Sequence, residues 1–130
     1  MDKANVKLQI RWQTIDPLGN TVALKEETYL NHITNDHEPK DAAFRNKTEN
    51  LAFDTIIHPR YIIKDFNNDN RVNYIDIVQT KDESGRVKLK VMKVVVDIIP
   101  NPNEVVTFIV QRKISDTVKE EGVIYDSQNQ

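Results

Sequence analysis

The strongest constraint on this fold is a run of strand-like segments that fills the chain from residue 61 to residue 114. Three turn signals divide the run: Asn67-Asn68-Asp69-Asn70, residues 81–85, and Pro100-Asn101-Pro102-Asn103. Asn, Asp, Gly and Pro adopt or impose the backbone angles that tight turns need. Strands that follow one another through short turns pair as an antiparallel meander. The sequence therefore predicts four antiparallel strands, over 61–66, 71–80, 87–99 and 104–114.

The third of these strands changes its pattern halfway. Apolar residues occupy odd positions from Val87 to Val91, and even positions from Met92 to Ile98. A bulge of one residue would move the apolar side chains to the other face of the sheet. A second half that is buried on both faces would give the same pattern, and the sequence leaves both alternatives open.

The N-terminal part of the chain predicts a hairpin and two helices. Residues 6–12 alternate as a half-buried strand, and a turn at 16–20 leads to a short return strand at 21–25. Helical spacing then predicts a helix over 26–37, ended by Pro39. A second helix over 48–57 has a broad apolar face and is ended by Pro59.

These elements predict an α+β fold: two N-terminal helices packed on a four-stranded antiparallel meander sheet, with an N-terminal β-hairpin. We expect one domain over 1–114, with the hairpin at 1–25. The polar tail at 115–130 is expected to be flexible, except around Val123 to Tyr125, because it has little apolar surface to bury.

Composition excludes several classes of protein. The 130 residues include no cysteine, so disulfides, cysteine nucleophiles and cysteine-bound metals are excluded. No apolar run approaches the roughly 18 residues that span a bilayer, and the first residues lack a signal-peptide core. We therefore expect a soluble, cytoplasmic protein without membrane contact. The net charge of −2 argues against wholesale coating of nucleic acid.

Three histidines are the first candidates for chemistry: His32, His37 and His58. His37 lies on the apolar stripe at the end of the first predicted helix, where the helix dipole favours a protonated imidazole. His32 and His37 are five residues apart, which does not suit paired zinc ligands on a helix. We expect no metal and no cofactor.

Basic side chains gather in the predicted sheet. Residues 81–113 hold seven basic and four acidic residues, in a chain that is acidic as a whole. Arg86, Lys88 and Lys90 form a row on one side of the third strand. Such a row is either a solvated sheet face or a place that binds phosphate.

The order of these motifs resembles the phage-associated branch of the barnase–EndoU–colicin–RelE nuclease superfamily. The similarity spans about residues 20 to 114. It rests on a histidine helix (His32-Ile33, then His37-Glu38), a helix–strand junction (Ile57-His58-Pro59-Arg60-Tyr61-Ile62-Ile63), and a last strand with Val106-Thr107 followed by Arg112-Lys113.

The resemblance implies metal-independent RNA cleavage on the concave face of the sheet. It implies that His37 or His32 is the acid–base residue, that Thr107 supplies a hydroxyl, and that Arg112 or Lys113 binds phosphate. Substrate-binding roles would fall to Arg60, Tyr74, Lys88 and Lys90. RNA supplies its own nucleophile, the 2′-hydroxyl, so an imidazole and phosphate-binding cations are sufficient chemistry.

Other functions fit the same sequence. A catalytically inactive relative could serve as an accessory or inhibitor module that binds a protein or RNA, and this alternative explains the acidic net charge better. A small structural protein of phage origin is the third alternative. The expected partners are accordingly RNA as a substrate, or an inhibitor or host protein.

Overall fold

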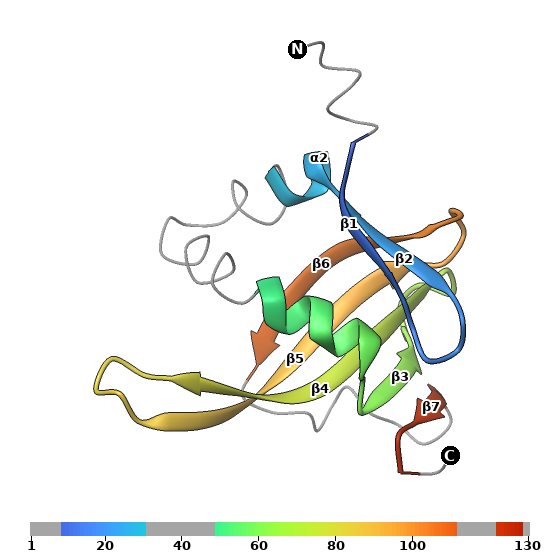
Figure 1. Cartoon of the computed structure of the whole chain (residues 1–130). Helices are drawn as coiled ribbons and strands as arrows, with labels where there is room; N and C mark the ends of the chain where they lie inside the picture. Colours follow the sequence, from blue (N-terminus) through green and yellow to red (C-terminus); the bar gives the residue numbers. More distant parts are fainter. Residues whose placement is uncertain (1–8, 31–48, 112–121, 129–130) are drawn as a thin grey trace.

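The β4–β5 hairpin is built from the two longest strands among the described residues. In this computed structural model, which describes residues 9–30, 49–111 and 122–128, β4 (Arg71–Lys81) pairs with β5 (Val87–Asp97) in an unbroken antiparallel register. β3 (Tyr61–Lys64) lies beside β4, and β6 (Asn103–Gln111) lies beside β5. These four strands form a meander (Figure 1).

Three further strands extend the meander to a seven-stranded mixed sheet in the order β1-β2-β6-β5-β4-β3-β7. β1 (Ile10–Ile15) and β2 (Thr21–Lys25) form the N-terminal hairpin, and β2 joins β6 in parallel. β7 (Val123–Asp126) pairs with β3 at the other edge. Figure 1 shows the two terminal additions on opposite sides of the meander.

The predicted fold class is therefore wrong. The described chain is mostly β-structure in one seven-stranded sheet, with two short helices, rather than two helices on a four-stranded sheet. The hairpin belongs to the sheet because Val22, Ala23 and Leu24 are all buried, as in a central strand. An ion pair of 2.6 Å between Lys25 and Glu104 fastens the parallel joint between β2 and β6.

Two helical segments lie within the described residues. α2 (Glu26–Thr28) follows β2 directly, and the rest of the predicted helix over 26–37, from residue 31 on, lies outside the described residues. Residues 49–57 are helical, in agreement with the predicted second helix. The helix ends before Pro59, which is buried at the junction with β3.

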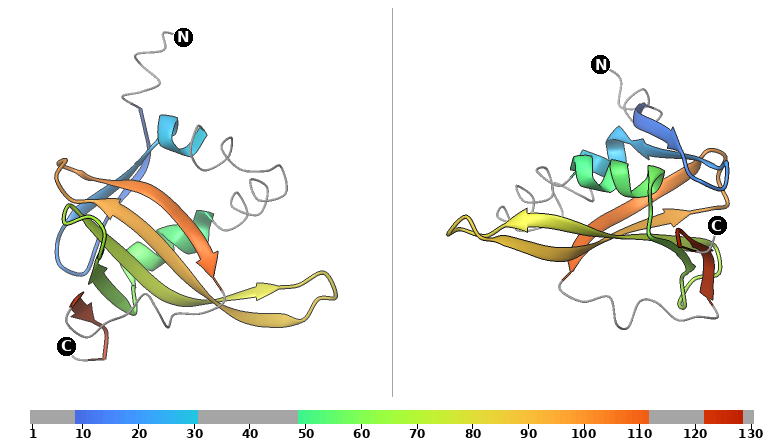
Figure 2. Two further views of the ribbon diagram at one scale, coloured as in Figure 1. Left: turned by 180° about the vertical axis from the view of Figure 1, so that it is seen from behind. Right: turned by 60° about the horizontal axis from the view of Figure 1, so that its bottom comes forward.

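The main core lies between the 49–57 helix and one face of the sheet, which we call the helix face. Ala52 and Ile56 of the helix pack in one cluster with Met92, Val94 and Phe108 of β5 and β6. Figure 2 shows the helix on this side of the strands. The opposite side, which we call the back face, carries a smaller buried cluster of Ile63, Ile75 and Val91.

The changed pattern in β5 reflects burial on both faces. Its pairing with β4 runs without a break from Arg71↔Asp97 to Lys81↔Val87, so β5 has no bulge against β4. Val94 is buried on the helix face and Val95 on the back face. A register shift does occur between β5 and β6, where Val95 and Val96 pair with Thr107 and Val105.

Candidate functional site

Four of the residues predicted to carry RNA cleavage, His32, His37, Arg112 and Lys113, lie outside the described residues. Their roles stay predictions. The positions of the other candidates, Thr107, Arg60, Tyr74, Lys88 and Lys90, can be compared directly.

Tyr74 is a core residue rather than a substrate-binding one. Its side chain is 1% exposed, and its hydroxyl donates a hydrogen bond of 2.5 Å to Asp16 Oδ2. Burial, together with this bond to a carboxylate, raises the pKa of Tyr74. Asp16 also accepts bonds from the backbone N–H groups of Leu18 and Asn20, so the pair locks the β1–β2 turn onto β4.

Thr107 and the two lysines lie on opposite faces of the sheet. Thr107 pairs with Val95, which puts its side chain on the back face. Lys88 and Lys90 share the parity of Met92, which packs against the helix face. These predicted site residues therefore do not converge on one phosphate.

Arg60 lies where the 49–57 helix passes into β3. Its backbone N–H donates a hydrogen bond of 2.7 Å to the carbonyl oxygen of Ile75. Asp76 is the nearby carboxyl: burial raises its pKa, whereas its bond from the Ile77 N–H and the charges of Arg60 and His58 act in the opposite direction. The His58-Pro59-Arg60 motif thus ends the helix and places two basic side chains near a partly buried acid.

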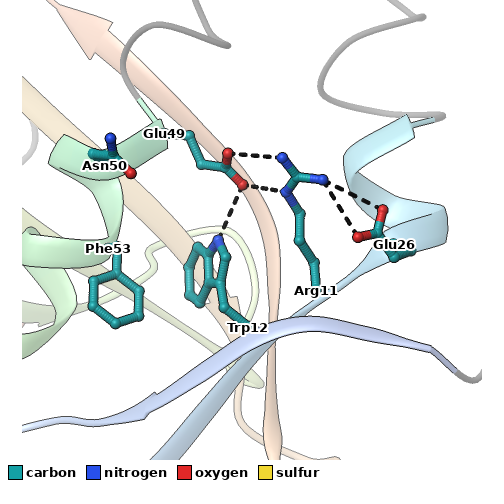
Figure 3. A pocket seen from close by; sticks show the side chains of 6 residues that line it. All are labelled: Arg11, Trp12, Glu26, Glu49, Asn50 and Phe53. Atoms are coloured by element: carbon teal, nitrogen blue, oxygen red, sulfur yellow. Dashed lines mark hydrogen bonds and ion pairs between the residues drawn. The ribbon is translucent and has the colours of Figure 1, made fainter.

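A pocket that the sequence did not reveal lies between β1 and the 49–57 helix (Figure 3). Its volume is about 420 Å³. Trp12 and Phe53 meet edge to face there, with ring centroids 5.0 Å apart. The other lining residues are Arg11, Glu26, Glu49 and Asn50.

Arg11 occupies the polar side of this pocket. Its Nε donates a hydrogen bond of 2.5 Å to one carboxylate oxygen of Glu49, and one terminal nitrogen donates a hydrogen bond of 3.0 Å to the other. Glu26 lies 3.3 Å from the other terminal nitrogen, and the guanidinium carbon lies 3.6 Å from the centre of the Tyr29 ring. Trp12 Nε1 donates a hydrogen bond of 3.0 Å to Glu49 Oε2 (Figure 3).

The contacts of Arg11, Glu49 and Trp12 stabilise the packing of β1 on the helix, and their charged groups are already bound to one another. Bonding to Glu49 is the main reason that the pKa of Arg11 is raised, so the guanidinium stays charged. Glu49 is engaged by both Arg11 and Trp12, which leaves it poorly suited to accept a proton from a substrate. Among the described residues, no group of three His, Asp or Glu side chains is placed to hold a metal ion.

The second distinctive region is the far end of the β4–β5 hairpin. Among the described residues, pairing of β4 with β3 ends at Ile75, and pairing of β5 with β6 ends at Val91, opposite Gln111, but β4 and β5 stay paired to Lys81 and Val87. Residues 76–90, which we call the arm, therefore form a two-stranded ribbon that projects from the sheet (Figures 1 and 2).

The arm has two unlike faces. On the back face, Ile77, Val87 and Leu89 are 42%, 57% and 66% exposed. On the helix face, the arm presents Lys88 and Lys90. An isolated two-stranded ribbon is marginally stable, and exposed aliphatic rows mark surfaces that contact other molecules.

Comparisons with protein-family models, curated proteins and solved structures found no match for this chain. The resemblance to the nuclease superfamily therefore stays a prediction. In the part of the chain that the structure describes, no helix is long and apolar enough to cross a membrane.

Proposed function

We propose that this chain is a non-catalytic module that binds another protein through its arm. The observation that carries the proposal is the aliphatic row of Ile77, Val87 and Leu89 on a projecting ribbon. Val78 at the base of the arm belongs to the main core, but Ile77, Val87 and Leu89 lie on the other face and are exposed, so these aliphatic side chains are best explained by contact with a partner.

The chemistry of the arm indicates a protein partner. Burying aliphatic surface stabilises a protein complex, whereas nucleic-acid backbones are bound mainly through positive charge. The arm and the next three residues hold five basic and three acidic residues, in a chain with a net charge of −2. We therefore expect an apolar patch with an acidic rim on the partner.

The test begins with a photo-crosslinking residue in place of Leu89, introduced into the chain in its natural host. Each protein that becomes crosslinked is then purified. Its binding to the parent chain, to Leu89→Ser and to Ile99→Ser is measured by calorimetry. Ile99 is a matched control because it is an exposed aliphatic residue outside the arm.

We expect at least one purified partner that binds the parent and Ile99→Ser equally, and binds Leu89→Ser at least about tenfold more weakly. The proposal would be contradicted if every captured protein bound Leu89→Ser as tightly as it binds the parent chain. So would cleavage of a synthetic RNA by the parent chain that Thr107→Ala abolishes and Thr80→Ala retains, because that result would establish the competing ribonuclease prediction.

A further inference from the structure

We propose that the chain forms a symmetric dimer in which residues 77–81 of β4 pair, antiparallel, with the same residues of a second copy. This inference goes beyond the proposed function and rests on a different observation: the backbone edge of β4 where β3 has ended. The dimer would place two arms side by side, with both aliphatic rows on the same side of one continuous sheet.

The backbone direction identifies which groups this edge presents. Ile75 O accepts a bond from Arg60 N, and Arg71 O accepts one from Asp65 N, so odd residues of β4 direct their backbone groups toward β3. Because this direction alternates along an antiparallel strand, Ile77, Gln79 and Lys81 direct theirs to the same side. No described strand pairs with them there.

The side chains leave this edge open to pairing. Residues 77–80 are Ile-Val-Gln-Thr, which favour strands and include no charge, proline or glycine. Natural proteins usually block sheet edges with charged residues, proline or a bulge. The arm's other edge, on β5, carries Lys88 and Lys90, and β1 has a register shift at Arg11. The β4 edge has one charged residue, Lys81 at the end of the paired segment, and no proline, glycine or bulge between residues 77 and 81.

Symmetry fixes the register. A two-fold axis through Gln79 pairs Gln79 with its own counterpart and Ile77 with Lys81 of the other copy, which uses the whole free edge. The Ile77 N–H already donates 2.9 Å to Asp76 Oδ1. The remaining groups would form about four hydrogen bonds between the copies.

Charges of both signs meet at the two ends of the seam. The arm turns at Asp82 and Glu83, immediately after the paired residues. In this register the turn of one copy reaches the start of β3 in the other, where Arg60 precedes Tyr61, the partner of Ile75. In the same register Asp82 of one copy lies opposite Asp76 of the other, so His58 and Arg60, whose charges act on Asp76, are shared between carboxylates of both copies at each end, and such charge contacts favour one register over others.

The main test is sedimentation of the full chain over a range of concentrations. We expect a dimer for the parent and a monomer for Gln79→Pro, which removes the central outward N–H without affecting the β4–β5 ladder. Leu89→Pro is the matched control, because Leu89 lies directly opposite Gln79 and faces the other edge of the arm. It should remain dimeric, and circular dichroism checks that each variant is folded.

Charge reversal tests the register. Glu83→Arg alone and Arg60→Glu alone should each raise the dimer dissociation constant about tenfold, and the double variant should restore it. Since the chain has no cysteine, Gln79→Cys should form a disulfide-linked dimer on mild oxidation, whereas Asp69→Cys, in an exposed turn, should not.

A parent chain that sediments as a monomer at all concentrations would overturn the dimer, as would a dimer that persists in Gln79→Pro. Neither result would affect the proposed function if Leu89→Ser still weakens binding of a purified partner. A parent chain that is dimeric, but whose captured proteins all bind Leu89→Ser as tightly as the parent, would instead remove the proposed function and leave this inference standing.

Discussion

Glu49 holds two side chains of β1 at the aromatic pocket. It accepts two hydrogen bonds from Arg11 and one from Trp12, and it joins β1 to the 49–57 helix. We expect Glu49→Ala to lower the free energy of unfolding by about 2 kcal/mol, because hydrogen bonds to charged groups are lost and Arg11 keeps only the longer contacts with Glu26 and its contact with the Tyr29 ring.

Urea unfolding measures this change, with Asp54→Ala as the control, since Asp54 is exposed on the same helix. The fluorescence of Trp12, the only tryptophan, should also change in Glu49→Ala, because its indole N–H loses its acceptor. Equal stability of the two variants would show that the cluster contributes nothing measurable.

The environment of Tyr74 determines how the free energy of unfolding should change with pH in the alkaline range. Burial and the bond to Asp16 raise the pKa of Tyr74 above the ordinary value near 10. The unfolded chain therefore loses this proton at lower pH than the folded chain does. The resulting stability is fully present below about pH 10 and is lost as the pH rises above it.

Tyr74→Phe should consequently be less stable than the parent by about 1–2 kcal/mol at neutral pH, because Asp16 loses a buried donor. It should also lose stability less steeply above pH 10. Thermal unfolding between pH 7 and 11 measures both effects, with Tyr61→Phe as the control. A slope identical to that of the parent would contradict the assignment.

Sequence reasoning at the residue scale found the histidine and basic motifs but missed the aromatic pocket. Nothing in the sequence joins Arg11 to Glu49, because that contact depends on how β1 lies across the helix. A buried tyrosine and an exposed one also look alike in a sequence. The resemblance therefore gives Tyr74 a substrate-binding role, whereas its side chain lies in the core.

At the scale of elements, local patterns predicted more than long-range pairing did. The meander strands and the 49–57 helix lie close to their predicted bounds, since turn residues and apolar periodicity mark them directly. The β2–β6 joint had no such signal, and the apolar residues from Val123 to Tyr125 marked the place of β7 without indicating β3 as its partner. A parallel contact of two residue pairs, and a four-residue strand in a polar tail, depend on tertiary packing.

Gly122 provides a test of how firmly β7 is attached. A side chain at this position would meet Ile63 Cγ2 at 3.3 Å and Lys64 O at 3.7 Å. We expect Gly122→Val to separate β7 from β3 and to lower the free energy of unfolding by about 1–3 kcal/mol through overpacking. Hydrogen exchange of the β3 amides should show the loss of protection.

Ser127→Val is the control for this variant, because Ser127 is exposed just beyond β7. If hydrogen-exchange protection of the β3 amides were unchanged in Gly122→Val, the space beside residue 122 would be large enough to hold a valine side chain. The contact between Gly122 and Ile63 would then have no role in holding the edge strand.

On the scale of the whole molecule, the N-terminal hairpin and the meander share one core. Val22 and Leu24 of β2 pack in the same cluster as Met92 and Phe108, and Trp12 packs against it. The hairpin is therefore expected to unfold together with the rest of the sheet, as single domains of this size usually do.

Two probes can follow the two parts separately, because Trp12 is the only tryptophan and lies on β1. We expect the urea transition seen by tryptophan fluorescence to coincide with the one seen by far-ultraviolet circular dichroism, which reports on the sheet as a whole. A fluorescence midpoint at clearly lower urea would show that β1 and β2 detach first. The parallel joint with β6 would then be a weak attachment between two units, contrary to the single domain over 1–114 that the sequence predicts.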